Sequence, residues 1–146
     1  MERTAQAARE FGDANDAVDQ AAADHLGINR TDYRIVAVTH IAGPLSAGRL
    51  AEAVDLSPAA TTEAVQRLVA KGLLTRDVDP DDRRRAVIAR VPAVGEALDA
   101  FYEPVRDGGF ALLRRYTVAE LALIRGFLDH GRALQLAVAE RIRNGG

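Results

Sequence analysis

The chain has 146 residues, a mass of 15.7 kDa and a formal charge of −2, and 48% of its residues are apolar. These values are typical of one globular domain and exclude a disordered or low-complexity chain. Cysteine is absent, which excludes disulfides, thiol nucleophiles and thiol-based redox sensing.

No apolar run reaches the roughly 18 to 20 residues of a membrane helix, and the first ten residues lack the apolar core of a signal peptide. We therefore expect a cytoplasmic protein without a membrane partner. The histidines are His25, His40 and His130, and their spacing is not that of metal ligands. The sequence also lacks a glycine-rich phosphate loop and a nucleophile with its base, so we expect no metal, no cofactor and no enzymatic activity.

A first helix is predicted over residues 2–25. Phe11, Val18, Ala22 and Leu26 recur at spacings of seven, four and four, which places them on one face of a helix. Gly27 then interrupts the pattern. An apolar stripe of this length indicates that the helix packs against another surface.

A second helix is predicted over residues 33–42, and it is apolar on nearly every side. Either Asn29 or Thr31 can cap its start, and Gly43 with Pro44 ends it. A helix that is apolar all round is buried, so we expect this one in the middle of the fold.

Two helix-capping signals follow. Ser46 predicts the start of a short helix over residues 47–54, and Ser57 followed by Pro58 predicts the start of another. Gly72 ends the second of these helices. Its buried face is predicted to comprise Thr61, Ala64, Val65 and Leu68.

The periodicity then changes from helical to alternating. Residues 73–78 and 86–91 read LLTRDV and AVIARV, and they predict the two strands of a β-hairpin. The residues between them, DPDDRRR at 79–85, combine a turn signal with three adjacent arginines. Such a loop is either a solvated turn or a tip that reaches another molecule. Alternation in the second strand predicts burial of Val87, Ala89 and Val91.

The remainder of the chain is predicted to be helical. One helix covers about residues 93–102, and Pro104 either kinks it or starts it again. Thr117 and Glu120 have the spacing of a capping box, which opens a final helix. The apolar stripe of this last helix comprises Leu121, Ile124, Leu128, Leu134 and Val138.

Residues 45–86 read LSAGRLAEAVDLSPAATTEAVQRLVAKGLLTRDVDPDDRRRA and resemble the DNA-binding core of the MarR family of transcriptional regulators. The resemblance extends over nearly the whole chain. It implies a mainly α fold with a small β-hairpin wing, in which a winged helix-turn-helix is flanked by long N- and C-terminal dimerisation helices. We expect residues 1–146 to form a single domain, with an N-terminal dimerisation helix at 1–30, a DNA-binding lobe at 31–92 and C-terminal dimerisation helices at 93–146.

The resemblance also implies that the helix opened by Ser57 faces the major groove of DNA. Its groove-facing residues would be Ser57, Ala59, Ala60, Thr62, Glu63, Gln66 and Arg67. Arg67 has an equal claim to a structural role in packing between this helix and the wing. Glu63 departs from the polar or basic residue common at its position. It would repel phosphate unless it accepts from a cytosine amine or pairs with Arg67 four residues on.

At the hairpin tip, the resemblance places an arginine in the minor groove, held by an acid two positions before it. Counting forward from Gly72 gives Arg84 with Asp82, whereas counting back from Gly95 gives Arg85. The expected wing site therefore comprises Asp82, Arg83, Arg84 and Arg85. The burial predicted for the second strand favours one inserted residue within the arginine run.

These features predict a sequence-specific, double-stranded DNA-binding transcriptional regulator. The resemblance implies a homodimer that reads a pseudo-palindromic operator and represses transcription until a small aromatic or anionic effector binds. The effector-binding residues would be Tyr33, Arg34 and His40, although Tyr33 and His40 could equally be core residues with satisfied hydrogen bonds. The alternative is a degenerate winged-helix module that binds a protein instead of DNA, which the net negative charge and Glu63 favour.

Overall fold

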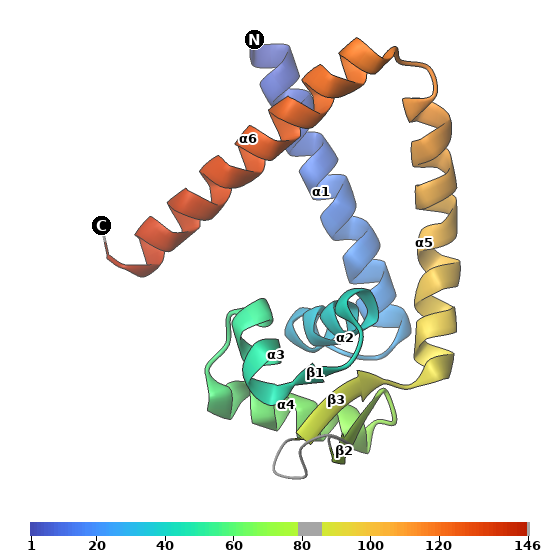
Figure 1. Ribbon diagram of the computed structural model, residues 1–146, viewed down its shortest axis with the longest axis vertical. Coiled ribbons are helices and arrows are strands. Elements are labelled where there is room, and N and C mark those ends of the chain that lie inside the picture. The colour runs from blue at the N-terminus through green and yellow to red at the C-terminus, as the bar shows by residue number, and fades with distance from the viewer. Residues whose placement is uncertain (79–85, 146) are drawn as a thin grey trace. The chain divides into compact units, whose positions relative to one another are not determined.

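The computed structural model describes residues 1–78 and 86–145 (Figure 1). Its elements are α1 (Glu2–His25), α2 (Arg30–Ala42), β1 (Leu45–Ser46), α3 (Ala47–Val54), α4 (Pro58–Ala70), β2 (Leu74–Val78), β3 (Ala86–Arg90), α5 (Pro92–Leu113) and α6 (Val118–Arg143). They form two compact units, Met1–Phe101 and Tyr102–Gly146. Within the described ranges, no helix carries an apolar stretch long enough to cross a bilayer.

The first predicted helix is confirmed as α1. Only its C-terminal end enters the core, where Ala22 and Ala23 are buried, whereas Phe11 is 63% exposed. The chain then turns at Gly27, whose φ of 64° lies in the left-handed region that glycine adopts without strain. The N-terminal part of the apolar stripe of α1, at Phe11, is therefore left exposed by its own unit, whereas Val18 is half-buried.

The second helix, α2, lies at the centre of the first unit, where it contacts α1, α3, α4 and β3. Of the two candidate caps, Asn29 is the one used: its side-chain oxygen accepts a 2.8 Å hydrogen bond from the backbone N–H of Asp32. The helix therefore begins at Arg30, earlier than predicted. Ile35 and Val36 are fully buried, which confirms the expected central position.

The helix-turn-helix of α3 and α4 forms as predicted. Ser46 and Ser57 cap its helices and accept hydrogen bonds of 3.4 and 3.2 Å from the backbone N–H groups of Arg49 and Ala60. Between the helices, Asp55 adopts a φ of 55°, a left-handed conformation that aspartate tolerates better than most residues. The predicted inner face of α4 is confirmed, since it buries Thr61, Ala64, Val65 and Leu68.

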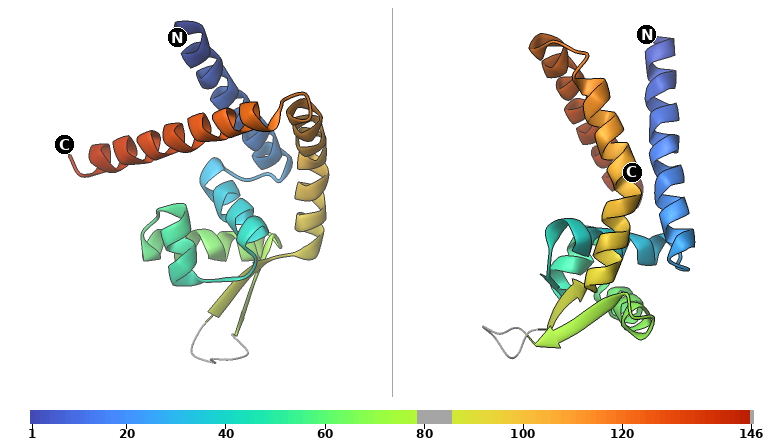
Figure 2. Two further views of the ribbon diagram at one scale, coloured as in Figure 1. Left: turned by 45° about the horizontal axis from the view of Figure 1, so that its top comes forward. Right: turned by 90° about the vertical axis from the view of Figure 1, so that its right-hand side faces the viewer.

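The predicted hairpin is confirmed, but it belongs to a three-stranded antiparallel sheet in the order β1-β3-β2. The strand β1 has two residues, which pair with Ile88 and Val87 of β3. Sequence analysis missed it because two residues are too few to show an alternating period. Figure 2 shows the hairpin of β2 and β3 extending away from the helices of this unit.

The burial predicted for β3 is wrong. Ile88 is the strand's buried residue, with an exposed fraction of 1%. The residues predicted to be buried are only half-buried, namely Val87, Ala89 and Val91. Ile88 lies opposite Arg76 of β2, which puts it on the same face of the sheet as the buried Leu74. A shift of one residue exchanges the two faces of a strand, so the observed burial does not favour an inserted residue in the arginine run.

The helix α5 continues past Pro104, so of the two predicted alternatives the restart at Pro104 is wrong. Pro92 opens the helix in its first turn, where the missing N–H would have had no partner. The fixed φ of Pro104 is also compatible with a helix, and its missing N–H removes one hydrogen bond in one turn. Gly95 leaves room for the guanidinium of Arg90, which a Cβ at this position would meet.

The last helix, α6, begins at the predicted capping box. The backbone N–H of Thr117 donates to Glu120 Oε2 at 2.7 Å, and the backbone N–H of Glu120 donates to Thr117 Oγ1 at 3.3 Å. The backbone hydrogen bond from Thr117, followed by that from its hydroxyl, lowers the pKa of Glu120. This contact stabilises the fold above the ordinary pKa of glutamate, and the stabilisation is lost as the pH falls through the lowered value.

Replacing Leu68 by alanine should lower the free energy of unfolding by about 2 to 5 kcal/mol, because the truncation leaves a cavity beneath α4. Leu68 is completely buried, whereas its neighbour Val69 is 37% exposed. Val69→Ala is therefore the control, with an expected loss below about 1 kcal/mol. Urea denaturation followed by circular dichroism measures both values, and equal losses would contradict the packing described for α4.

Candidate nucleic-acid interface

The outward face of α4 lies opposite the face that packs against α2 and α3. Its residues Ala59, Thr62, Glu63 and Gln66 are exposed, whereas Ala60 at the edge is half-buried. Ser57 at the cap and Arg67 toward the C-terminal end are also exposed. The residues that sequence analysis selected on this helix therefore share one accessible surface, apart from the half-buried Ala60.

Two hydroxyl groups of this surface take part in the first turn of α4 itself. Ser57 Oγ accepts from the backbone N–H of Ala60, as described above. Thr62 Oγ1 donates to the carbonyl oxygen of Pro58 at 2.8 Å. Because these contacts orient both hydroxyls along the helix, each keeps only part of its hydrogen-bonding capacity for another molecule.

Arg67 is held by Asp32 on the neighbouring helix α2. Arg67 Nη2 donates to Asp32 Oδ1 at 2.8 Å, and the side chains are 50% and 4% exposed, respectively. The hydrogen bond from Arg67 to Asp32, followed by the negative charge of Asp32, raises the pKa of Arg67. A buried carboxylate is costly without a partner, so this contact gives Arg67 a structural role between α4 and α2.

Sequence analysis missed Asp32 as the partner of Arg67. The local sequence carries little signal for this pair, because Asp32 stands in the first turn of α2, where an acid is common whether or not it is buried. The sequence also does not say which of the many arginines would pair with it.

Glu63 and Gln66 keep their polar groups available. Neither makes a hydrogen bond or an ion pair with another residue in the ranges 1–78 and 86–145. The predicted alternative of a Glu63–Arg67 pair amounts to a minor electrostatic effect on Arg67, smaller than that of Asp32. These two side chains are thus the least committed polar groups on the outward face of α4.

The predicted wing site lies outside the described residues; it comprises Asp82, Arg83, Arg84 and Arg85. The strands on either side of this segment are described up to its ends. Val78 of β2 and Ala86 of β3 are paired directly across the hairpin. The described parts of the two strands therefore end in register with each other.

The structure separates His40 from the other two candidate effector-binding residues. Tyr33 and Arg34 line a hollow of about 500 Å³ beside α1, α2 and the turn between α3 and α4. His40 lines a different hollow of about 190 Å³, together with Arg90 of β3. His40 Nε2 also lies 3.1 Å from Asp99 Oδ1 of α5. Tyr33 is only 3% exposed, which agrees with a core position.

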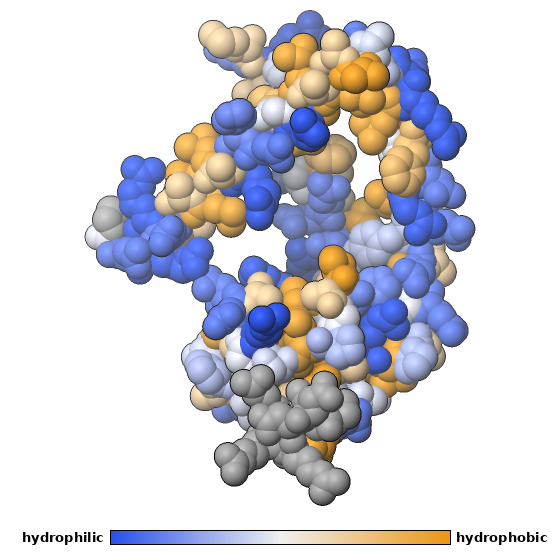
Figure 3. All heavy atoms as spheres, viewed as in Figure 1, coloured by the Kyte–Doolittle hydropathy of each residue, from blue (hydrophilic) through white to orange (hydrophobic). Residues whose placement is uncertain are grey.

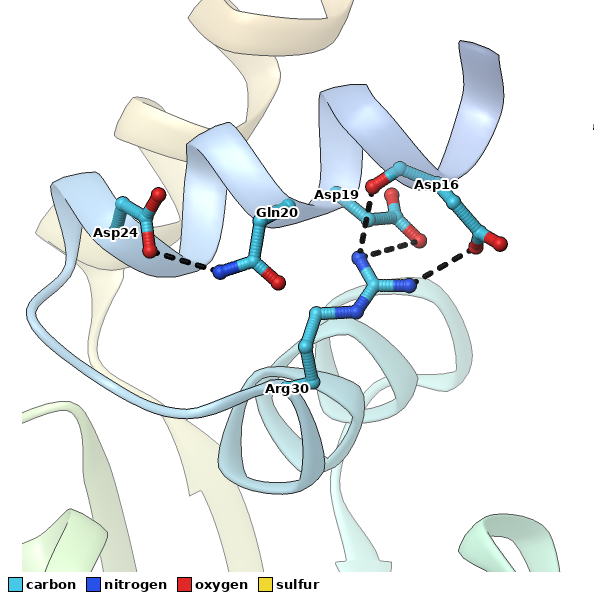
Figure 4. A network of polar contacts seen from close by, with 5 residues as sticks. All are labelled: Asp16, Asp19, Gln20, Asp24 and Arg30. Carbon is cyan, nitrogen blue, oxygen red and sulfur yellow. Dashed lines mark hydrogen bonds and ion pairs between the residues drawn. The ribbon is translucent and has the colours of Figure 1, made fainter. Parts of the chain in front are cut away.

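Arg30 connects α1 to α2 at the edge of the larger hollow (Figure 4). Its Nη2 donates to Asp16 Oδ1 at 2.9 Å, its Nη1 donates to the carbonyl oxygen of Asp16 at 3.2 Å, and Nη1 lies 3.8 Å from Asp19 Oδ2. A further hydrogen bond of 2.8 Å runs along α1 from Gln20 to Asp24. Exposed pairs of this kind add little stability, but they fix the position of Arg30.

Comparison with known proteins finds similarity to transcriptional regulators. Residues 26–85 match the sequence profile of the MarR family. The chain is 34% identical over 144 residues to the uncharacterized HTH-type transcriptional regulator YcgE of Bacillus subtilis (strain 168), covering 98% of this chain and 94% of that protein.

Solved structures share its fold, and two of them serve as examples. Wild-type MarR in its apo form from E. coli has a TM-score of 0.57 at 19% identity, with 86% of this chain and 93% of that chain covered. A mutant of S. aureus MepR bound to an oligodeoxyribonucleotide has a TM-score of 0.60 at 16% identity, with 91% and 97% covered. At these identities the structures show the likeness of the fold alone.

Replacing Arg67 by alanine should lower the melting temperature by several degrees, because the Asp32 carboxylate stays buried without its partner. The double variant Asp32→Ala/Arg67→Ala should melt closer to the wild type than the sum of the two single losses predicts. Thermal denaturation measures the cycle, with the exposed Gln66→Ala as a control of little effect. Additive losses would show that the pair contributes no coupling.

Proposed function

The chain belongs to the MarR family of transcriptional regulators, and from this premise we propose that it binds a specific double-stranded DNA site through α4 and the segment that joins β2 to β3. The observation that carries the proposal is the packing of α4: its inner face is buried in the first unit, and its polar face points outward. A helix held in this way fits the major groove of B-DNA, which is about 12 Å wide. The shared fold with a protein solved on an oligodeoxyribonucleotide supports the same reading.

In this proposal the wing supplies the positive charge. Arg83, Arg84 and Arg85 would follow the DNA backbone, with Arg84 or Arg85 in the minor groove and Asp82 holding it in place. Arginine suits this task because its planar guanidinium remains charged and donates several hydrogen bonds at once. In this proposal α4 reads the base sequence, whereas the wing adds affinity and fixes the register of the protein on the DNA.

We propose further that two copies of the chain associate through α1, α5 and α6, the helices expected to dimerise at residues 1–30 and 93–146. No residue of α6 is buried within the described chain. Leu123, Phe127 and Leu134 recur at helical spacing and are 74%, 55% and 67% exposed. Figure 3 shows apolar side chains, in orange, along α5 and α6. Large exposed apolar surfaces mark association sites, and a symmetric dimer would present two α4 helices to a pseudo-palindromic operator.

The proposed regulator is a repressor that a small aromatic or anionic effector releases. The hollow beside α2 suits such a ligand: the exposed Arg34 offers a cation, and Ala37, Val38 and Ile41 offer an apolar wall. An effector lowers DNA affinity only if it prefers a conformation that binds DNA poorly. His40 would not take part in this hollow, because it lines the smaller one.

A protein-interaction role is the second candidate, favoured by the net charge of −2 and by the exposed acid on α4. The two roles differ in their dependence on salt. Binding through DNA phosphates weakens steeply as the salt concentration rises, because bound counterions are released on association. A protein contact made through the short side chains of α4 has no comparable dependence.

The double variant Arg84→Ala/Arg85→Ala should bind DNA at least about tenfold more weakly than the wild type, because it loses cationic contacts to phosphate and to the minor groove. The measurement is titration of labelled DNA from upstream of the chain's own gene against scrambled competitor, repeated at several salt concentrations. The slope of log affinity against log salt should be smaller in the variant.

The matched control for the wing is Arg114→Ala/Arg115→Ala, which removes two adjacent, exposed arginines between α5 and α6. This variant should keep the affinity of the wild type. Equal losses in both variants would show that total charge sets the affinity and not the wing. Absence of wild-type binding to any fragment at low and moderate salt would favour the protein-interaction role.

The purified chain should sediment at twice its monomer mass of 15.7 kDa. Leu134→Glu places a charge on the apolar face of α6 and should shift the protein to monomer at micromolar concentration, since a buried unpaired charge opposes association. Gln135→Glu adds a charge at the neighbouring exposed position and should leave the dimer intact. Sedimentation velocity distinguishes these outcomes, and a Leu134→Glu dimer would place the interface elsewhere.

A further inference from the structure

We infer that Glu63 makes this chain select a cytosine at one position of each half-site; the inference rests on the DNA-binding function proposed above and specifies it. Glu63 lies in the second turn of α4, fully on the outward side, opposite the buried residues of the helix. Ala59, one turn earlier on the same side, offers only a methyl group. The carboxylate of Glu63 is therefore the strongest acceptor at the centre of this face.

The other polar groups of the outward face are already partly engaged. The hydroxyls of Ser57 and Thr62 bond to the first turn of α4, and the guanidinium of Arg67 is held by the buried Asp32. On this face of α4, Gln66 and Glu63 have head groups that bond to no other residue in the ranges 1–78 and 86–145. Base reading by α4 would therefore depend mainly on these two.

The two free side chains differ in the bases that they can match. The amide of Gln66 donates as well as accepts, so it suits several bases. The ionised carboxylate of Glu63 only accepts, so it requires a donor on the base edge. In the major groove, cytosine offers its N4 amine as a donor, and this is the base that glutamate and aspartate match.

The other three bases give the Glu63 carboxylate no suitable donor, and their acceptor groups repel it. Guanine presents two acceptors in the major groove, and thymine presents an acceptor with its methyl group. Adenine has an amine, but its N7 acceptor lies beside it and would repel a carboxylate. The surrounding phosphates repel Glu63 at every site, so only a donor on the base offsets the cost of bringing it into the groove.

Arg67 does not remove this requirement by neutralising Glu63. Its shortest contact is the 2.8 Å hydrogen bond to Asp32, and Asp32 dominates the rise in its pKa, with Glu63 a minor contributor. Because Asp32 is buried, releasing Arg67 to Glu63 would strand a carboxylate in the core. The pair Arg67–Asp32 thus keeps Glu63 available for the base.

Selection from a randomised double-stranded DNA library, followed by sequencing, tests the inference with the wild type, Glu63→Gln and Glu52→Gln. The wild type should return sites with cytosine at one position in each half-site. Substitution of that cytosine should then weaken binding about tenfold, the size of a typical single mismatch. Glu63→Gln should lose the preference, because its amide can meet donors and acceptors alike.

Glu52→Gln is the matched control, since it removes the same charge from an exposed position on α3 in the same unit. It should strengthen binding to all sequences alike and keep the cytosine preference. The inference is overturned if Glu63→Gln selects the same base as the wild type, or if both variants change affinity uniformly across sequences. If the wild type prefers no sequence over non-specific DNA, the proposed function itself fails, and this inference fails with it.

Discussion

The hydrogen bond between Arg67 and Asp32 connects the outward-facing helix α4 to the central helix α2. Its strength follows from burial, because the carboxylate of Asp32 is removed from water and depends on this cation. Leu68, one residue further along α4, is completely buried and adds apolar packing to the inner face of this helix. Since α2 also contacts α1 and β3, the same helix orients the candidate recognition surface, the strands of the wing and the end of the N-terminal helix.

This arrangement divides the polar residues of α4 into two groups. Ser57 and Thr62 stabilise the start of the helix, and Arg67 anchors it, so these side chains serve its position. Glu63 and Gln66 make no hydrogen bond or ion pair with the other described residues, so within this part of the chain they remain available for contacts with a partner. Membership of the MarR family accounts for the shared architecture, whereas the acid at position 63 would distinguish the DNA site of this particular chain in the proposed function.

The central helix also connects the two activities that we propose. Tyr33 and Arg34 line the hollow for an effector and directly follow Asp32, which holds α4 through Arg67. A ligand in the hollow would therefore act on the same turn of α2 that positions α4, a short physical route between the two sites. The second unit differs in character: α6 has a complete capping box at its start, but no buried residue, which is the pattern expected of a helix that packs against another chain.

The sequence by itself determined the starts of α3, α4 and α6 and the inner face of α4. Caps such as Ser57 and the box at Thr117 act between residues three positions apart, so their signals are fully present in the local sequence. Tertiary structure alone decided that Ile88 is the buried residue of β3, that Arg67 pairs with an acid on another helix, and that His40 lies apart from the other candidate ligand residues. Strand register and contacts between distant segments set these features, and no local periodicity in the sequence encodes either.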